Sequence, residues 1–198
     1  MTHHLLTWSG VDDPTRVDHA SVELGQTSMR AIGGAVAQDV SSSWELDVGI
    51  GWVTRALRVT TRGFGWARSL ELTRSATGEW AAQSTAWGDA DLPLPGLADP
   101  GSVAGAVDCD LGLCPVTNTM PIRRLDLLNR DVDETHLVMA WVEMPSLRVL
   151  RSDQLYSSGA RGDRTHVRYQ SFSRDFDASL SVDAHGLVVD YPTLARRV

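Results

Sequence analysis

Apolar residues in this chain recur at every second position far more often than at the three- and four-residue spacing of a helix. Trp44, Leu46 and Val48, for example, share one face of an extended segment, while the charged residues between them take the other face. No stretch longer than about ten residues shows a helical period. Parallel strands need helical crossovers, which this pattern lacks, so the sequence predicts an all-β fold of mainly antiparallel strands.

The same alternation predicts about ten or more short strands, separated by Gly, Asp, Asn or Pro. They fall at residues 44–48, 53–60, 70–73, 122–128, 137–143, 147–156, 166–171, 179–183 and 187–191. Other expected elements are short helices near 111–113 and 193–197, an extended proline-rich connection over 89–101, and a polar hairpin loop over 157–164. Because the pattern does not change along the 198 residues, we expect a single domain, residues 1–198.

The charged residues exclude several classes of partner. All 18 basic residues are arginine, so lysine chemistry, such as a Schiff base or a P-loop lysine, is absent. With 25 acidic residues the net charge is −7, which disfavours nucleic-acid backbones and anionic membrane surfaces. No apolar run approaches the roughly 18 residues of a membrane helix, and no basic-plus-apolar leader occurs. We therefore expect no integral membrane association and a cytoplasmic location.

Motifs of the common enzyme and metal-binding classes are missing from the sequence. It contains no Gly-x-Ser-x-Gly, no Walker sequence, no EF-hand loop and no His-Glu-x-x-His. Two cysteines, Cys109 and Cys114, are too few for a disulfide framework or a structural zinc site. We expect no cofactor and no bound metal. Catalysis stays an open question with a non-enzymatic role favoured, and the oligomeric state is not predicted.

Two aspartates flank Cys109 and form the clearest candidate polar site. If this segment is a strand, Asp108 and Asp110 project from one face, where they can hold a cation, a pair of sugar hydroxyls or an arginine. Arg123 and Arg124 follow soon after, so we favour hydrogen bonds and ion pairs over a metal. Cys109 then points to the opposite face as a buried, unreactive thiol.

The aspartate pair opens a distinctive segment, Val-Asp-Cys-Asp-Leu-Gly-Leu-Cys-Pro-Val-Thr-Asn-Thr-Met-Pro-Ile-Arg-Arg-Leu-Asp-Leu at 107–127. Further segments follow in order: Ala-Trp-Val-Glu-Met-Pro-Ser-Leu at 140–147, Gln-Leu-Tyr at 154–156, Arg-Tyr-Gln-Ser at 168–171, and Val-Asp-Ala-His-Gly-Leu-Val-Val-Asp-Tyr-Pro at 182–192. Together they resemble the bacterial "putative glycolipid-binding" family over essentially the whole chain. Cys109, Cys114 and Met120 depart from the residues usual in that family, each by an apolar exchange.

The resemblance implies a spiral β-roll, a half-barrel sheet curled around an apolar cavity, with few short helices. It also implies the partner, a small amphiphilic ligand of the glycolipid or fatty-acyl type. A binder of this kind needs an apolar cavity for acyl chains and a polar rim for the head group.

Candidate ligand-binding residues follow from these needs. Tryptophan packs on sugar rings and carries one N–H donor, which suggests Trp44 and Trp141, although each can equally be a core residue. Arg123 and Arg124 point to opposite faces if their segment is extended, so that one pairs with an aspartate and the other binds an anionic head. The complete predicted ligand-binding set is Trp44, Asp108, Asp110, Asn118, Arg123, Arg124, Trp141, Tyr156 and Tyr169.

We therefore expect non-enzymatic binding or carriage of an amphiphilic small molecule in an apolar cavity with a polar, arginine-bearing rim. One alternative is a hydrolase-type enzyme on a lipid or sugar-linked substrate, with Asp108 and Asp110 as general acid and base. The other is a protein-interaction module whose concave face holds a partner segment.

Overall fold

The computed structural model describes residues 1–198 and consists of one continuous 14-stranded sheet with little helix. The strands are β1 (Thr2–Gly10), β2 (Val17–Leu24), β3 (Met29–Val36), β4 (Val40–Gly49), β5 (Val53–Gly63), β6 (Trp66–Arg74), β7 (Trp80–Gly88), β8 (Asp108–Leu111), β9 (Thr135–Val142), β10 (Val149–Ser158), β11 (His166–Ser171), β12 (Phe176–Val182), β13 (Val188–Tyr191) and β14 (Ala195–Arg197). The helices are η1 (Pro100–Val103), η2 (Pro115–Asn118), α1 (Thr119–Arg124) and η3 (Phe172–Arg174). No helix is long and apolar enough to cross a membrane. The predicted all-β class is confirmed.

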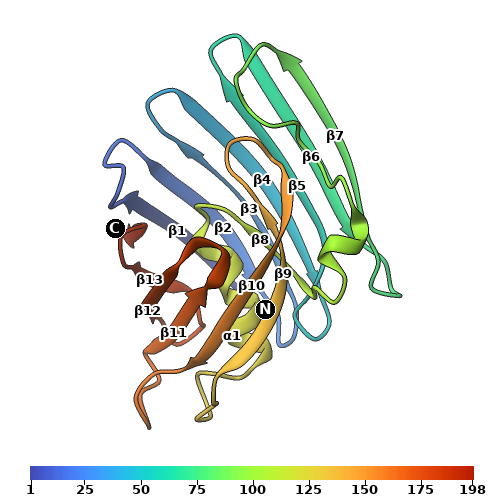
Figure 1. Cartoon of the computed structure of the whole chain (residues 1–198). Helices are drawn as coiled ribbons and strands as arrows, with labels where there is room; N and C mark the ends of the chain where they lie inside the picture. Colours follow the sequence, from blue (N-terminus) through green and yellow to red (C-terminus); the bar gives the residue numbers. More distant parts are fainter.

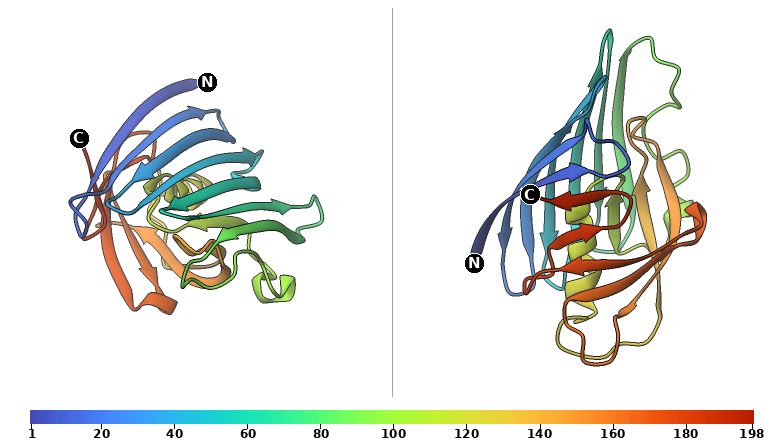
Figure 2. Two further views of the ribbon diagram at one scale, coloured as in Figure 1. Left: turned by 90° about the horizontal axis from the view of Figure 1, so that it is seen from above. Right: turned by 90° about the vertical axis from the view of Figure 1, so that its left-hand side faces the viewer.

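The strand order places the two halves of the chain on the two sides of a central pair. In space the order is β7-β6-β5-β4-β3-β2-β1-β14-β13-β12-β11-β10-β9-β8, so β1 and β14 pair in the middle and β7 and β8 form the edges (Figure 1). Every neighbouring pair is antiparallel except β8 and β9, which are parallel. The sheet is therefore unclosed, and it curls around α1, drawn in yellow inside the curl in Figure 2.

Alternating residues explain why the sheet curls around its own interior. In the register of β4, β5 and β6, Leu46, Leu57 and Leu72 lie side by side on the inner face and are fully buried. The intervening positions, such as Arg58, are exposed on the outer face. A core of 29 buried residues fills the space between these strands and β8, and a second core of 11 lies under β10–β13.

The turn between β4 and β5 shows how packing fixes a local conformation. Gly51 has a φ of 78°, and Trp52 follows with a φ of 62°, a left-handed conformation that non-glycine residues rarely adopt. Trp52 is held there because its indole is buried and its backbone N–H donates to the Thr27 carbonyl at 3.0 Å. The buried ring then forms part of the floor beneath α1.

Three local predictions were wrong. The segment predicted as a strand over 122–128 holds the end of α1 and a turn, while the predicted helices at 111–113 and 193–197 are strand ends and turns. Pro115 and Pro121 lie in the first turns of η2 and α1, where the missing N–H of proline costs nothing. Thr119 to Ile122 are all buried, so α1 has no wholly polar face and no amphipathic period that a sequence reading can detect.

Candidate functional site

Polar side chains gather on the inner face of β8–β11, inside the curl. Asp108 and Asp110 project from the same face of β8, as predicted, opposite Met139 and Trp141 of the parallel strand β9. Cys109 takes the other face and is buried, also as predicted. Burial raises the pKa of the Cys109 thiol to about 12, which keeps the sulfur protonated at neutral pH.

Asp108 is committed to an internal ion pair. Its two carboxylate oxygens accept hydrogen bonds from Arg124 Nη1 and Nη2, the second at 2.6 Å, and only 1% of the side chain is exposed. Burial raises the pKa of the Asp108 carboxyl, and the two Arg124 hydrogen bonds oppose that rise. Arg124 Nη1 also donates to the Trp52 carbonyl at 3.3 Å. The pair therefore ties β8 to α1 and to the β4–β5 turn.

Asp110 differs from Asp108 because its carboxylate reaches a pocket. Thr117 Oγ1 donates to Oδ1 at 3.0 Å, and Gln154 Nε2 donates to Oδ2 at 2.7 Å. Arg174 Nη2 lies 3.5 Å from Oδ2, and 14% of the Asp110 side chain is exposed. Asp110 is thus a hydrogen-bond acceptor held in one orientation at a pocket wall.

Arg174 connects Asp110 to the aromatic side chains. Its guanidinium lies 5.1 Å from the centroid of the Trp141 ring, within the range of a cation–π contact. It donates to Ser171 Oγ at 3.0 Å and to the Tyr169 hydroxyl. Trp141, whose indole supports this arginine, is therefore part of the polar cluster.

Three tyrosines form the floor of this cluster. The Tyr156 hydroxyl donates to Asn118 Oδ1 at 2.9 Å, and the Tyr156 and Tyr169 ring centroids are 5.1 Å apart. Tyr191 packs edge-on against Tyr169 with centroids at 5.9 Å. Burial raises the pKa of all three phenols, so they act as neutral hydrogen-bonding groups.

Two buried polar atoms near Asp110 have no protein partner. The indole Nε1 of Trp141, a donor, and Oε1 of Gln154, an acceptor, form no hydrogen bond. Buried polar groups are nearly always paired, so such atoms need an explanation. One of these atoms needs an acceptor and the other a donor, and a hydroxyl group can serve as either.

Two pockets lie on either side of the Leu111–Cys114 segment, which contributes to both. The Asp110 pocket, about 190 Å³, is also lined by Asn118, Arg174 and Tyr191. The Trp44 pocket, about 200 Å³, is mostly apolar and is also lined by Val40 and Met144. The two pockets therefore adjoin. The Trp44 pocket is the more apolar, although Asp13, Arg16 and Asp18 also line it, and the Asp110 pocket mixes polar and apolar residues.

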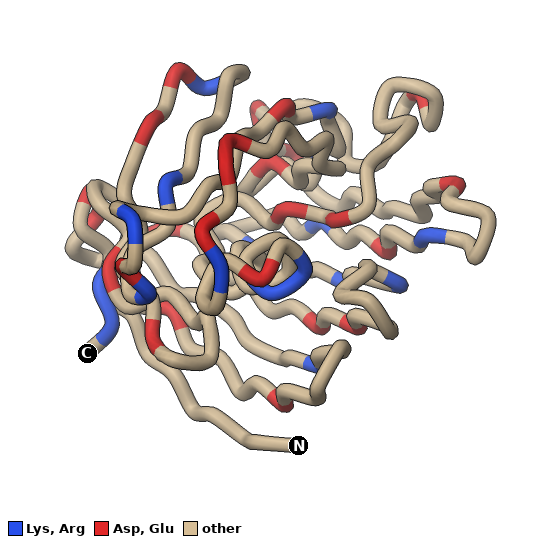
Figure 3. The backbone as a smooth tube through the Cα atoms, turned by 90° about the horizontal axis from the view of Figure 1, so that it is seen from below, with Lys and Arg blue, Asp and Glu red and all other residues tan.

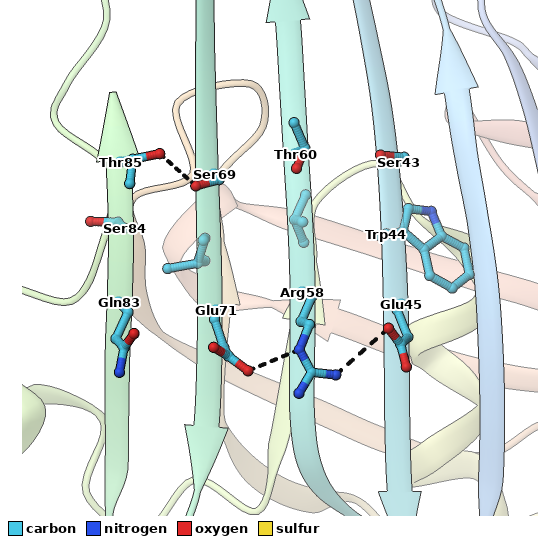
Figure 4. A pocket seen from close by; sticks show the side chains of 12 residues that line it. Ser43, Trp44, Glu45, Arg58, Thr60, Ser69, Glu71, Gln83, Ser84 and Thr85 are labelled. Carbon is cyan, nitrogen blue, oxygen red and sulfur yellow. Dashed lines mark hydrogen bonds and ion pairs between the residues drawn. The ribbon is translucent and has the colours of Figure 1, made fainter. Parts of the chain in front are cut away.

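The largest hollow of the molecule has a different construction. It measures about 620 Å³ and lies on the outer face of β4–β7 (Figure 4). Arg58 bridges Glu45 at 3.6 Å and Glu71 at 2.8 Å, and a row of hydroxyls including Ser69 and Thr85 runs parallel to these charges. None of the residues lining this hollow carries a buried polar atom without a partner, in contrast to Trp141 and Gln154 near Asp110.

The predicted site residues separate into several environments. Asp110, Asn118, Trp141, Tyr156 and Tyr169 come together in the Asp110 cluster. Asp108 and Arg124 form the ion pair beside it, and Trp44 lines the neighbouring apolar pocket. Arg123 lies apart, 5.2 Å from the centroid of the Trp52 ring. Arg123 and Arg124 follow each other in a helix, so the extended arrangement expected for them was wrong.

Four further residues of this cluster lie outside the predicted ligand-binding set: Thr117, Gln154, Arg174 and Tyr191. Gln154 lies two positions before Tyr156 on β10, and this spacing indicates that the two side chains share a face of the strand. Arg174 lies in the short η3 helix and carries no such signal. The structure contains no group of three or more His, Cys, Asp or Glu side chains arranged to hold a metal ion.

Comparison with known proteins supports the resemblance drawn from the sequence. A sequence model of the family described as "Putative glycolipid-binding" matches residues 5–197. The chain is also similar to a crystal structure of a DUF1089 family protein from Pseudomonas aeruginosa, with 24% identity, a TM-score of 0.69, and coverage of 91% of this chain and 92% of that one. At this identity the likeness shows a shared fold. No curated protein matches the chain. The chain belongs to the family described as "Putative glycolipid-binding".

Proposed function

We propose that this protein binds an amphiphilic molecule with a hydroxyl-bearing head group, such as a glycolipid. The observation that carries the proposal is the adjoining pair of pockets, one lined by Asp110 and Arg174 and the other by apolar residues around Trp44. Together the pockets reach the lower end of the range for small-molecule sites, about 300–1,000 Å³. The family description points to the same ligand class.

The head group belongs in the Asp110 pocket. Asp110 accepts hydrogen bonds from hydroxyls, and Arg174 donates them, while Trp141 Nε1 and Gln154 Oε1 supply one further donor and acceptor nearby. This mixture suits a sugar better than a cation, because the arginine beside Asp110 already balances its charge.

The apolar part of the ligand belongs in the Trp44 pocket. Each methylene removed from water there contributes about 0.8 kcal/mol to binding. The apolar tail of the ligand therefore supplies most of the affinity, and the head group fixes its orientation. Acidic and arginine positions are interspersed along the backbone in the view of Figure 3, and the net charge is −7, which fits an uncharged head better than a polyanion.

The two-carboxylate hydrolase has less support. Acid–base catalysis of that kind needs two carboxyl groups facing the substrate, but both oxygens of Asp108 accept from Arg124. A binding role needs only Asp110 to remain accessible.

Calorimetry with octyl glucoside, below its micelle-forming concentration, tests the proposal. We expect wild-type protein to bind it, and Asp110→Asn to weaken binding about tenfold or more, because a hydrogen bond to a charged acceptor is lost. The matched control is Asp153→Asn, an exposed carboxylate on β10 that pairs with Arg151, and it should leave the dissociation constant unchanged. Equal binding by wild-type protein and Asp110→Asn would contradict the placement of the head.

A further inference from the structure

An arginine with two unpaired nitrogen atoms and no carboxylate partner lies on the inner face of the first half of the sheet. Arg68 of β6 is only 6% exposed. Its Nη2 donates to the Leu92 carbonyl at 3.2 Å, but Nε and Nη1 are buried without any hydrogen-bond partner. Asp89 and Asp91, the acidic residues nearest in sequence to Leu92, are exposed and form no ion pair with Arg68.

A buried guanidinium without a counter-charge is costly. Arginine keeps its proton in proteins, so it cannot escape the cost by becoming neutral. Breaking up a buried ion pair is strongly destabilising for the same reason, because one charge is left uncompensated. An anion bound at Arg68 would remove this penalty.

The neighbours of Arg68 lead to the Trp44 pocket. Across the strands, Ser42, Thr61, Arg68 and Ala86 form one row on the inner face. Thr61 Oγ1 donates to the Pro145 carbonyl at 2.9 Å, and both Ser42 and Pro145 line the Trp44 pocket. Arg68 therefore lies two strands from the wall of an apolar pocket.

We propose that Arg68 is an anion subsite that takes the carboxylate of a fatty acid whose chain occupies the Trp44 pocket. The planar guanidinium presents paired N–H donors that match the two oxygens of a carboxylate. Arg68 does not itself line the pocket, so the carboxylate end of the ligand has to reach past Thr61 to meet the guanidinium. This subsite rests on the pocket used in the proposed function, but it requires no sugar head and no contact with Asp110.

Calorimetry and thermal unfolding of the full chain with three probes test the subsite: sodium decanoate, decanol and sodium acetate. We expect wild-type protein to bind decanoate about ten- to a hundredfold more tightly than decanol, the range expected for hydrogen bonds to a charged group. Arg68→Met should bind decanoate no better than decanol. Arg62→Met, an exposed arginine on the neighbouring strand β5, is the matched control and should behave as wild type.

Three outcomes would overturn the proposal. Equal affinity of wild-type protein for decanoate and decanol would exclude an anion subsite. This comparison uses only wild-type protein, so it does not depend on the folding of a variant. Decanoate binding Arg68→Met as tightly as wild type would place the carboxylate elsewhere. Stabilisation by acetate equal to that by decanoate would show a site for free carboxylates instead of lipids.

If Arg68→Met proves unstable, Arg68→Lys serves as the second variant. It keeps the positive charge but loses the paired N–H donors of the guanidinium, so it should retain part of the preference for decanoate over decanol. Octyl glucoside binding to wild-type protein is measured alongside. If octyl glucoside does not bind but decanoate binds as predicted, the proposal of a sugar head group is wrong and the Arg68 subsite is supported.

Discussion

The two halves of the sheet are both mainly antiparallel, with β8 and β9 the one parallel pair, but they line their inner faces with different residues. In β1–β7 that face is mostly apolar, as Leu46, Leu57 and Leu72 show; Asp18 and Arg68 are also buried there, while most other charged side chains lie outside. In β8–β14 it carries Asp108 and Gln154, both buried, together with the tyrosines. Alternation along a strand thus determines which residues face inward, but not whether the inside serves for packing or for binding.

The difference also separates two kinds of polar interaction. The Glu45–Arg58–Glu71 row of the first half is exposed, and such pairs contribute about 0–1 kcal/mol each. The Asp108–Arg124 pair of the second half is enclosed, so loss of one partner leaves the other charged and buried. The first half also encloses charges: Arg16 pairs with Asp18 at 3.1 Å, whereas the buried Arg68 has no carboxylate partner.

The largest expected effect comes from breaking the enclosed pair. Arg124→Met should lower the free energy of unfolding by about 3–5 kcal/mol, because it strands the buried Asp108 carboxylate. Urea denaturation measures this loss. Arg58→Met, in the exposed row, should cost about 1 kcal/mol or less. Similar losses of unfolding free energy in the two variants would contradict the distinction between an enclosed ion pair in the second half and an exposed one in the first.

Sequence reasoning reached the fold class and the shared face of Asp108 and Asp110 because both depend on a two-residue period. It failed at α1, where Pro121 and buried neighbours replace any amphipathic signal. It also missed Arg174, since the distance between η3 and β8 in the sequence hides a contact that exists only after the sheet curls. Pairing across the curl is a property of the tertiary structure, and no local pattern encodes it.

A second prediction compares one hydroxyl from each half. Tyr156→Phe removes the donor to Asn118 Oδ1 and leaves that buried oxygen unpaired, so unfolding should become easier by about 1–3 kcal/mol. Thr85→Val removes a hydroxyl that pairs with Ser69 on the exposed outer face, and its effect should stay within about 0.5 kcal/mol. Urea denaturation of both variants decides the matter. A larger loss for Thr85→Val would reverse the comparison.

The smallest effect concerns the two thiols. Burial raises the pKa of Cys109 to about 12 and also raises that of Cys114, so iodoacetamide should label both thiols of the folded protein only slowly at pH 8. Labelling should quicken as the pH rises and when urea is added. Cys114 lines both pockets and should react first. Octyl glucoside should slow labelling of Cys114 but not of Cys109, as read by peptide mass spectrometry. Protection of both thiols alike would mean that the ligand acts through overall stability instead of occupying the pockets.

The central claim is that the curled sheet holds an amphiphile between the Asp110 and Trp44 pockets. Native mass spectrometry of gently purified protein, followed by solvent extraction and lipid analysis, tests it most directly. We predict a co-purifying amphiphile at close to one molecule per chain, depleted in Asp110→Asn and retained in Asp153→Asn. A mass equal to that of the bare polypeptide, with no thermal shift across a panel of glycolipids and fatty acids, would contradict the claim.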